Sequence, residues 1–274
     1  MNNDRLIGDC VVRASALHDH AERVANADFP GDEPPELARA IGSLAQALAE
    51  HLLLVRGLKS YRPETAAKLI RIVDGLIKWL YEPLRFADGA ATSRVPWSLV
   101  RPLQGFAQRI VPNTALLIRP KWRYNYSVVL SDLVADIRRA VEYALSSKKI
   151  DECLGGLRER LHIISFPFLE RRSVLLHAAL VHEIGHLVVE EYMASEKASC
   201  PESLQKEIVK SAVADTATTP LYETKEIKKG RLREVLRRLS ACAEYRKRAV
   251  QEIGADLVGL YLLGPAAIFA LYGI

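Results

Sequence analysis

The chain has 274 residues, of which 49% are hydrophobic and 26% charged, which is typical of a globular protein with one large domain or two modest ones. Its net charge of +5 comes from residues 225–248, which contain ten Lys or Arg and three Glu. The rest of the chain is not basic, so nucleic acid is not a favoured partner. The four cysteines have no CxxC spacing, which indicates neither a disulfide framework nor a thiol zinc site. No signal peptide is recognisable, and the predicted compartment is a reducing cytoplasm.

The first part of the chain has apolar residues at helical spacing. This pattern predicts one helix over residues 4–27, a second over 34–57 and a third that begins at Pro63. Residues 83–96 then have the Pro, Gly and Ser content of a linker. We therefore expect an α-helical N-terminal region over residues 1–90.

The second domain, residues 91–274, combines helical patterns with short runs of strand-forming residues. The elements predicted before residue 170 are a helix over 98–110, two strands over 115–118 and 124–129 joined by a turn, a helix over 131–146 and a strand over 161–166. The predicted fold class is α+β, mostly α, with a small β-sheet.

The segment after these elements contains the motif His182-Glu183-Ile184-Gly185-His186, an HExxH pattern inside an apolar stretch. On a helix, residues i and i+4 lie on the same face, so both imidazoles can bind one tetrahedral ion such as zinc. Glu183 lies about 100° around the helix, where it could take a proton from a water molecule that the ion acidifies. The alternative, a structural histidine pair, would bury polar groups without a partner.

A third ligand must come from elsewhere in the chain. The metzincin pattern HExxHxxGxxH is excluded because Val189 and Tyr192 occupy its glycine and third histidine positions. Ligands at i, i+4 and i+8 of a straight helix span about 12 Å, which rules out Glu190. Downstream, Glu252 and Asp256 form an ExxxD pattern in an apolar helical segment.

This pair of motifs resembles the gluzincin zinc metallopeptidases, and the ending Ala255-Asp256 is most similar to their membrane endopeptidase branch. The resemblance covers the two motifs only. It implies a zincin-like catalytic domain with His182, His186 and Glu252 as zinc ligands, and Glu183 as the general base. Asp256 would orient a ligand histidine. In such folds the strand before the motif helix is the sheet edge that receives a peptide, the alternative here being an ordinary core strand.

A different metal site is conceivable, because Glu159 and His162 form an ExxH pattern found in di-iron carboxylate bundles. That interpretation requires a helix where the sequence predicts a strand. We therefore do not favour it.

The basic segment is predicted to be a solvated helix that continues unbroken into Glu252, with an acidic partner as the alternative. Tyr245 and Arg248 then share a face with Glu252, where they could bind substrate or an oxyanion, unless each is simply exposed. Residues 257–274 have no charge, and they predict a buried helix under the metal site with a short helix after Pro265. Membrane association is the less favoured interpretation of this run.

The function predicted from these features is that of a zinc-dependent peptidase acting on a peptide or protein substrate. The alternative is a non-catalytic module in which a metal braces a helical regulatory or interaction protein. Glu183 favours the enzyme, because a structural zinc site needs no carboxylate beside its ligands.

Overall fold

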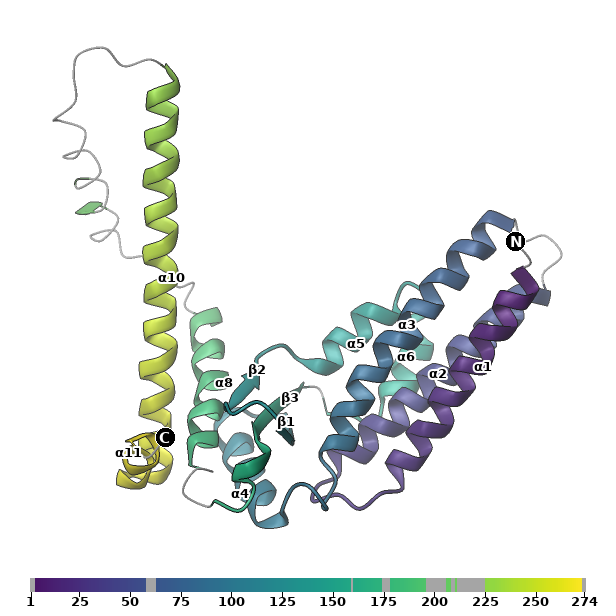
Figure 1. The fold of residues 1–274 in the computed structure, drawn as a ribbon, viewed down its shortest axis with the longest axis horizontal. Coiled ribbons are helices and arrows are strands. Elements are labelled where there is room, and N and C mark those ends of the chain that lie inside the picture. The colour runs from purple at the N-terminus through teal and green to yellow at the C-terminus, as the bar shows by residue number, and fades with distance from the viewer. Residues whose placement is uncertain are drawn as a thin grey trace.

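The computed structural model describes residues 3–57, 63–158, 160–173, 178–195, 206–207, 210 and 225–272. The chain is mostly helical with one small mixed sheet, which confirms the predicted α+β class. In Figure 1 the N-terminal helices lie on one side of the sheet and the C-terminal helices on the other.

Three long helices form the N-terminal region, as predicted, and Pro34 and Pro63 each lie in the first turn, where proline is tolerated. They are α1 (Asn3–Ala25), α2 (Glu33–Gly57) and α3 (Pro63–Gly89). Their core also includes residues of β1, α5, α6 and β3, so the helices are packed directly on one face of the sheet. The proposed boundary near residue 90 stays a prediction.

The sheet has the order β1-β3-β2, with β1 (Thr114–Lys121) parallel and β2 (Ser127–Val129) antiparallel to β3 (Arg160–Pro167). All three predicted strands exist, but β1 and β2 do not pair with each other, since β3 lies between them. The edge position expected for β3 is therefore wrong, and the alternative of a core strand is right. Pro167 occupies the last ladder position, where a missing N–H costs no interior hydrogen bond.

Alternate residues of β1 and β3 face two different cores. Leu117 and Ile163 pack with the N-terminal helices, whereas Leu116 and Ile164 pack with α4 (Trp97–Ile110) and α8 (Ala179–Ser195). Because both faces are covered, these strands are nearly continuous apolar runs. The helix α8 is therefore packed against one face of the sheet.

The connection between β2 and β3 contains α5 (Leu133–Val141) and α6 (Ser147–Leu154), and the 3-10 turn η1 (Phe168–Glu170) follows β3. The single helix expected over 131–146 is wrong beyond Val141, because the side chain of Ser146 caps a separate helix, α6. Asp132 accepts hydrogen bonds from Val134 N at 3.0 Å and from Leu161 N at 3.1 Å, which fixes the start of α5 against β3. His162 lies in β3, so the di-iron interpretation, which needs a helix there, is wrong.

The basic segment continues into Glu252 within one unbroken helix, α10 (Lys225–Leu263), as predicted. Gly264, with φ of 59°, ends it, and α11 (Pro265–Tyr272) follows. Burial of the apolar C-terminal run is wrong in part, because Leu257 and Tyr261 are exposed. The helix packs on α8 through its small residues, so these larger ones face outward. Among the described residues, no helix has the length and apolar character needed to cross a bilayer.

His162 is a buried histidine in the central strand β3. The residue is 7% exposed, and Nδ1 has no hydrogen-bond partner in the part of the chain that the structure describes. Burial lowers the pKa of this imidazole, and a backbone hydrogen bond with Val129 only partly offsets the effect. The folded chain therefore favours neutral His162.

We expect this residue to reduce the free energy of unfolding as the pH falls below about 6.5, the ordinary value in an unfolded chain. Below that pH the imidazole takes up a proton more readily in the unfolded chain than in the folded chain. The contribution of neutral His162 to stability is therefore present above about pH 6.5 and is lost as the pH falls. One pH unit below that value, the free energy of unfolding is reduced by at most about 1.4 kcal/mol. Urea unfolding at pH 7.5 and 5.5 should show a smaller loss for His162→Gln than for wild type. His51→Gln is the control, and equal losses in all three proteins would contradict the assignment.

Candidate metal centre

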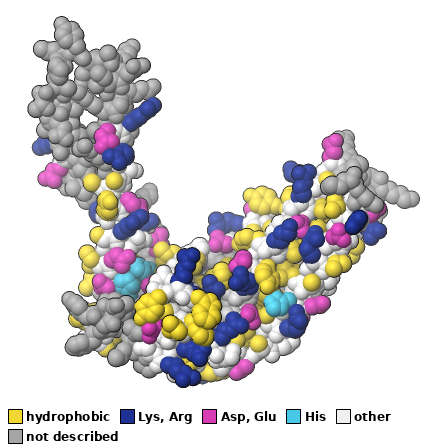
Figure 2. All heavy atoms as spheres, viewed as in Figure 1, with side chains coloured by type: hydrophobic (Ala, Val, Ile, Leu, Met, Phe, Trp, Pro, Cys, Tyr) yellow, Lys and Arg dark blue, Asp and Glu magenta, His cyan; other side chains and the backbone are white. Residues whose placement is uncertain are grey.

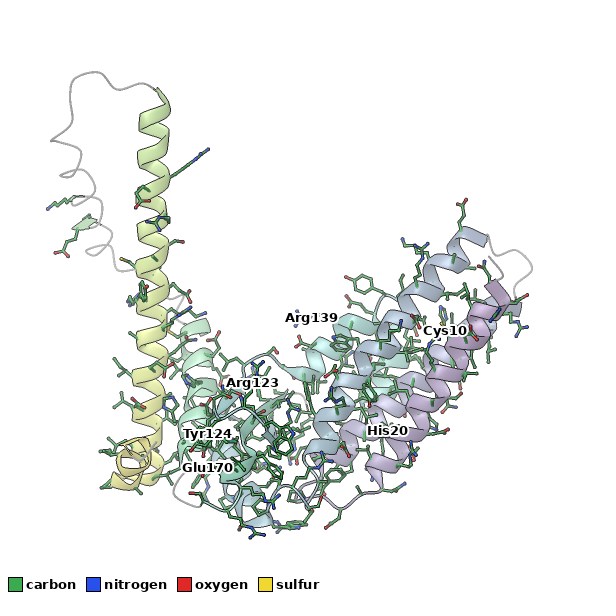
Figure 3. All side chains as sticks on the ribbon, in the orientation of Figure 1. Cys10, His20, Arg123, Tyr124, Arg139 and Glu170 are labelled. Atoms are coloured by element: carbon green, nitrogen blue, oxygen red, sulfur yellow. The ribbon has the colours of Figure 1, made fainter. Side chains whose placement is uncertain are left out.

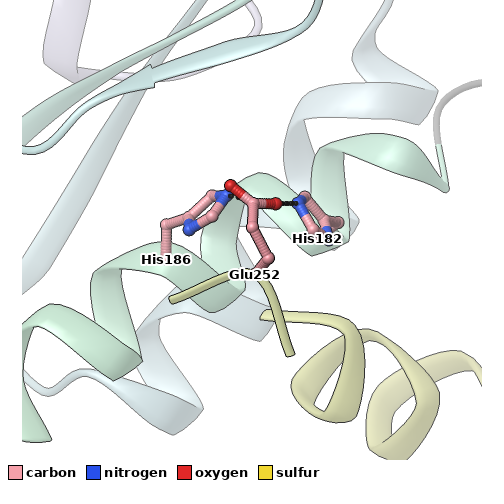
Figure 4. A group of neighbouring side chains, drawn as sticks. All are labelled: His182, His186 and Glu252. Carbon is pink, nitrogen blue, oxygen red and sulfur yellow. Dashed lines mark ion pairs between the residues drawn. The ribbon is translucent and has the colours of Figure 1, made fainter. Parts of the chain in front are cut away.

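Two helices bring three ligand-type side chains together. His182 and His186 lie one turn apart on α8, with their ring centroids 4.7 Å apart and nearly perpendicular. Glu252 of α10 faces both, and its Oε2 lies 3.4 Å from His182 Nε2 and 3.9 Å from His186 Nε2 (Figure 4). The three residues predicted as ligands therefore share one site, although 66 positions separate His186 from Glu252 in the chain.

The spacing of these donor atoms suits a small cation. All three lie within 4.8 Å of one another. Around tetrahedral zinc, with bonds of about 2.1 Å, neighbouring donors are about 3.4 Å apart. Small rotations of the side chains would thus bring the three donors to a common ion. The Glu252 side chain is 63% exposed, against 16% and 14% for the histidines, so one side of the site is open to solvent.

Asp256 fixes the orientation of one histidine. Its Oδ1 lies 2.8 Å from Nδ1 of His182. An ionised carboxylate only accepts hydrogen bonds, so Nδ1 carries the proton and donates it. In the neutral imidazole the lone pair is then on Nε2, the nitrogen that faces Glu252. The second residue of the ExxxD pattern thus holds His182 with Nε2 toward Glu252, and hydrogen-bonded carboxylates are common partners of metal-binding histidines.

The imidazole of His186 is also kept in the form that binds metals. Burial, followed by the charge of His182, lowers the pKa of His186, while Glu252 and Asp256 oppose this. A neutral imidazole is the form with a free lone pair. The surroundings of His186 therefore favour its neutral form.

Glu183 points to a different neighbour, the edge strand β2. Burial raises the pKa of its carboxyl group, and the charge of His182 and a backbone hydrogen bond with Val128 act in the opposite direction. Smaller effects come from Glu252, which raises this pKa, and from Lys121, which lowers it. Glu183 is not part of the three-residue ligand group, yet it lies close enough to feel the charge of Glu252.

Lys121 is a neighbour of Glu183 that the sequence did not reveal. It ends β1, and its Nζ donates a hydrogen bond of 2.5 Å to Oγ of Ser127, the first residue of β2. Burial lowers the pKa of the Lys121 ammonium group, and the charge of Glu183 partly offsets this effect. Lysine is common at strand ends, so the sequence does not indicate that Lys121 belongs to a functional site. The order of the strands in the sheet places it near Glu183.

The two site helices approach each other closely at small residues. A Cβ atom on Gly185 would lie 2.7 Å from both Cα and the carbonyl oxygen of Ala255, and one on Gly254 would lie 2.5 Å from Cγ2 of Val189. These contacts leave no room for larger residues. The glycine inside HExxH therefore determines how near Glu252 can come to the two histidines.

We expect Gly185→Ala to push α10 away from α8 and to weaken metal binding, because the contact at Ala255 is with backbone, which cannot rotate aside. Overpacking of this kind usually costs about 1–3 kcal/mol. Gly75→Ala is the matched control, since a Cβ atom on Gly75 of α3 would meet open space, where alanine should stabilise by up to about 1 kcal/mol. Zinc titration and thermal melts of both variants test this. Unchanged zinc affinity in Gly185→Ala would contradict it.

The remaining predicted residues are not brought to the ligand group. Arg248 donates to Oε1 of Glu244 at 3.1 Å, and Tyr245 is 72% exposed, about 10 Å along the helix from Glu252. Their proposed contact with substrate or an oxyanion stays a prediction.

The glutamates near the motif have other partners. Glu190 accepts a hydrogen bond from Gln251 at 2.9 Å, and Glu191 accepts one from Arg160 at 3.1 Å. Neither belongs to the group of possible ligands. This agrees with the exclusion of Glu190 by helix geometry.

Comparison of the chain with models of protein families, with curated proteins and with solved structures gives no match. The functional interpretation therefore depends on the geometry of the site itself.

Proposed function

We propose that this protein is a zinc-dependent peptidase of the gluzincin type. The observation that carries the proposal is the convergence of His182, His186 and Glu252, with Glu183 beside them and outside the ligand group. A purely structural metal site would have no use for a carboxylate next to its ligands. The open side at Glu252 leaves space for a substrate.

The roles of the side chains follow from their contacts. Zinc, when bound, would polarise the carbonyl group of a peptide bond and acidify a water molecule. Glu183 takes a proton from the attacking water and passes it to the nitrogen of the departing amine. Asp256 keeps the proton of His182 on Nδ1, and so keeps Nε2 available.

The strand β2 supports a zincin-like arrangement of the substrate. Among the described strands it pairs only with β3, so its other edge has no strand partner. Its residue Val128 forms the backbone hydrogen bond to Glu183. A peptide added antiparallel or parallel to this edge would lie next to the general base. The edge strand of the proposed enzyme is thus β2, in place of β3.

The test is metal analysis combined with a peptide assay. Protein purified without chelator should contain, or take up, one zinc per chain, and should cleave members of a broad peptide library in mass-spectrometric detection. A chelator should stop cleavage, and added zinc should restore it. Absence of any metal binding would overturn the proposal. Zinc binding without any cleavage would favour the alternative, a module that the metal only braces.

A further inference from the structure

The loops at one end of the sheet form an exposed surface that has no role in the candidate metal centre. They follow β1 and β3, two parallel strands, so both loops leave the sheet at the same end. We call this the sheet-end surface. Its residues are Lys121 at the end of β1, Trp122, Arg123 and Tyr124 after β1, and Phe168, Leu169, Glu170, Arg171 and Arg172 after β3.

Large apolar side chains are unusually exposed there. Trp122 is 86% exposed, Leu169 79% and Tyr124 62%. Figure 2 shows hydrophobic side chains gathered on this face, close to a group of histidines. Apolar groups that gather on a surface, in contrast to single ones, usually mark a binding site.

Contacts between the two loops give this surface a defined shape. The rings of Trp122 and Phe168 have centroids 4.8 Å apart, and the guanidinium of Arg171 lies 4.5 Å from the Phe168 centroid. Tyr124 donates a hydrogen bond of 2.7 Å to Glu170, and Figure 3 shows these two residues side by side. The aromatic groups are therefore positioned before any ligand arrives.

The sheet-end surface is continuous with the candidate metal centre. Val128 of β2 forms the backbone hydrogen bond to Glu183, and its neighbour Ser127 accepts a hydrogen bond from Nζ of Lys121. The next residue in the chain is Trp122. An extended peptide along β2, at about 3.3 Å per residue, would reach the aromatic groups within a few residues of Glu183.

The charge of the two loops is strongly positive. The sheet-end surface contains four Lys or Arg, namely Lys121, Arg123, Arg171 and Arg172, and one acidic residue, Glu170, which already accepts a hydrogen bond from Tyr124. Arg123 and Arg172 are exposed beside the apolar groups. Such a surface attracts acidic groups and repels basic ones.

We propose that the sheet-end surface selects the substrate, and that it binds a bulky apolar side chain flanked by acidic residues in a peptide. This inference rests on the proposed peptidase function, because it treats the bound peptide as the substrate. The aromatic groups receive the apolar side chain, and Arg123 and Arg172 attract the flanking carboxylates. An anionic membrane could also meet aromatic and basic groups, but continuity with β2 and Glu183 favours a peptide.

Binding can be tested separately from cleavage by using the zinc-loaded Glu183→Gln variant. Four dye-labelled dodecapeptides are compared by fluorescence anisotropy, with a central Phe or Ala flanked by either Glu or Lys. We expect the Phe peptide flanked by Glu to bind about tenfold more tightly than the other three. Adding Trp122→Ala should remove the preference for Phe, and adding Arg123→Glu the preference for Glu. Adding Trp79→Ala, a partly exposed tryptophan on α3, should change neither.

Equal binding of the four peptides, or a preference that survives Trp122→Ala, would overturn the inference. A second result would also overturn it. In that result the protein binds vesicles containing phosphatidylserine, Trp122→Ala abolishes this binding, and the four peptides bind equally. Selective peptide binding together with no cleavage by wild type would support this surface while contradicting the proposed peptidase. Cleavage by wild type of all four sequences at equal rates would contradict the inference alone.

Discussion

Glu183→Gln is expected to keep its zinc and its fold while peptide hydrolysis falls by about 10² to 10⁴. Glutamine has nearly the shape of glutamate but cannot accept the proton of the attacking water. The metal should stay, because Glu183 lies outside the group formed by His182, His186 and Glu252. Stability should not fall, because burial raises the pKa of this carboxyl group and so disfavours its charge in the folded chain.

The matched control is Glu191→Gln, the same substitution on the same helix, where the side chain accepts a hydrogen bond from Arg160 at the surface. Zinc content, thermal melting and hydrolysis are measured for wild type and both variants. Full hydrolysis by zinc-loaded Glu183→Gln would refute the assignment of the general base. Loss of hydrolysis in Glu191→Gln to the same extent would mean that the assay detects a general effect on α8.

The second large effect is expected for the ligands. Glu252→Ala should lower zinc affinity by more than about 100-fold, because changing a residue that only supports a ligand usually costs about 10- to 100-fold. Asp256→Asn should lower zinc affinity by about 10- to 100-fold, since Asp256 contacts His182 and is not itself in the ligand group. His186→Ala should lose zinc like Glu252→Ala. Isothermal titration with zinc gives all three affinities.

Thermal melts with and without zinc separate metal loss from misfolding. Glu252 is mostly exposed, so Glu252→Ala should leave the metal-free stability within about 0.5 kcal/mol of wild type and lose only the increase that zinc produces. Glu190→Ala is the control on the facing helix, where the side chain contacts Gln251. If Glu252→Ala bound zinc as well as wild type while Glu190→Ala did not, the third ligand would have to be reassigned.

The local parts of this site could be read from the sequence. The i, i+4 spacing places His182 and His186 on one helix face whatever surrounds them, because that geometry needs only a few residues. The long helices and the three strands were also predictable, since apolar periodicity records which face of each element is buried. Even the break at Gly264 follows from local chemistry, as its positive φ suits glycine.

The tertiary structure alone decided the order of the strands and the neighbours of Glu183. The runs that form β1 and β2 look like a hairpin, but β3 pairs with both. Its residues after Arg160 are buried, so the backbone N–H and C=O groups along both of its edges need hydrogen-bond partners. The charge of Lys121 acts on Glu183 because that order brings β1 and β2 to the same sheet beside α8. The distance from His182 to Glu252 depends on Gly185 meeting Ala255, a contact between segments about 70 residues apart. Periodicity contains no information about such contacts, because it records burial along one element and not the identity of the element that covers it.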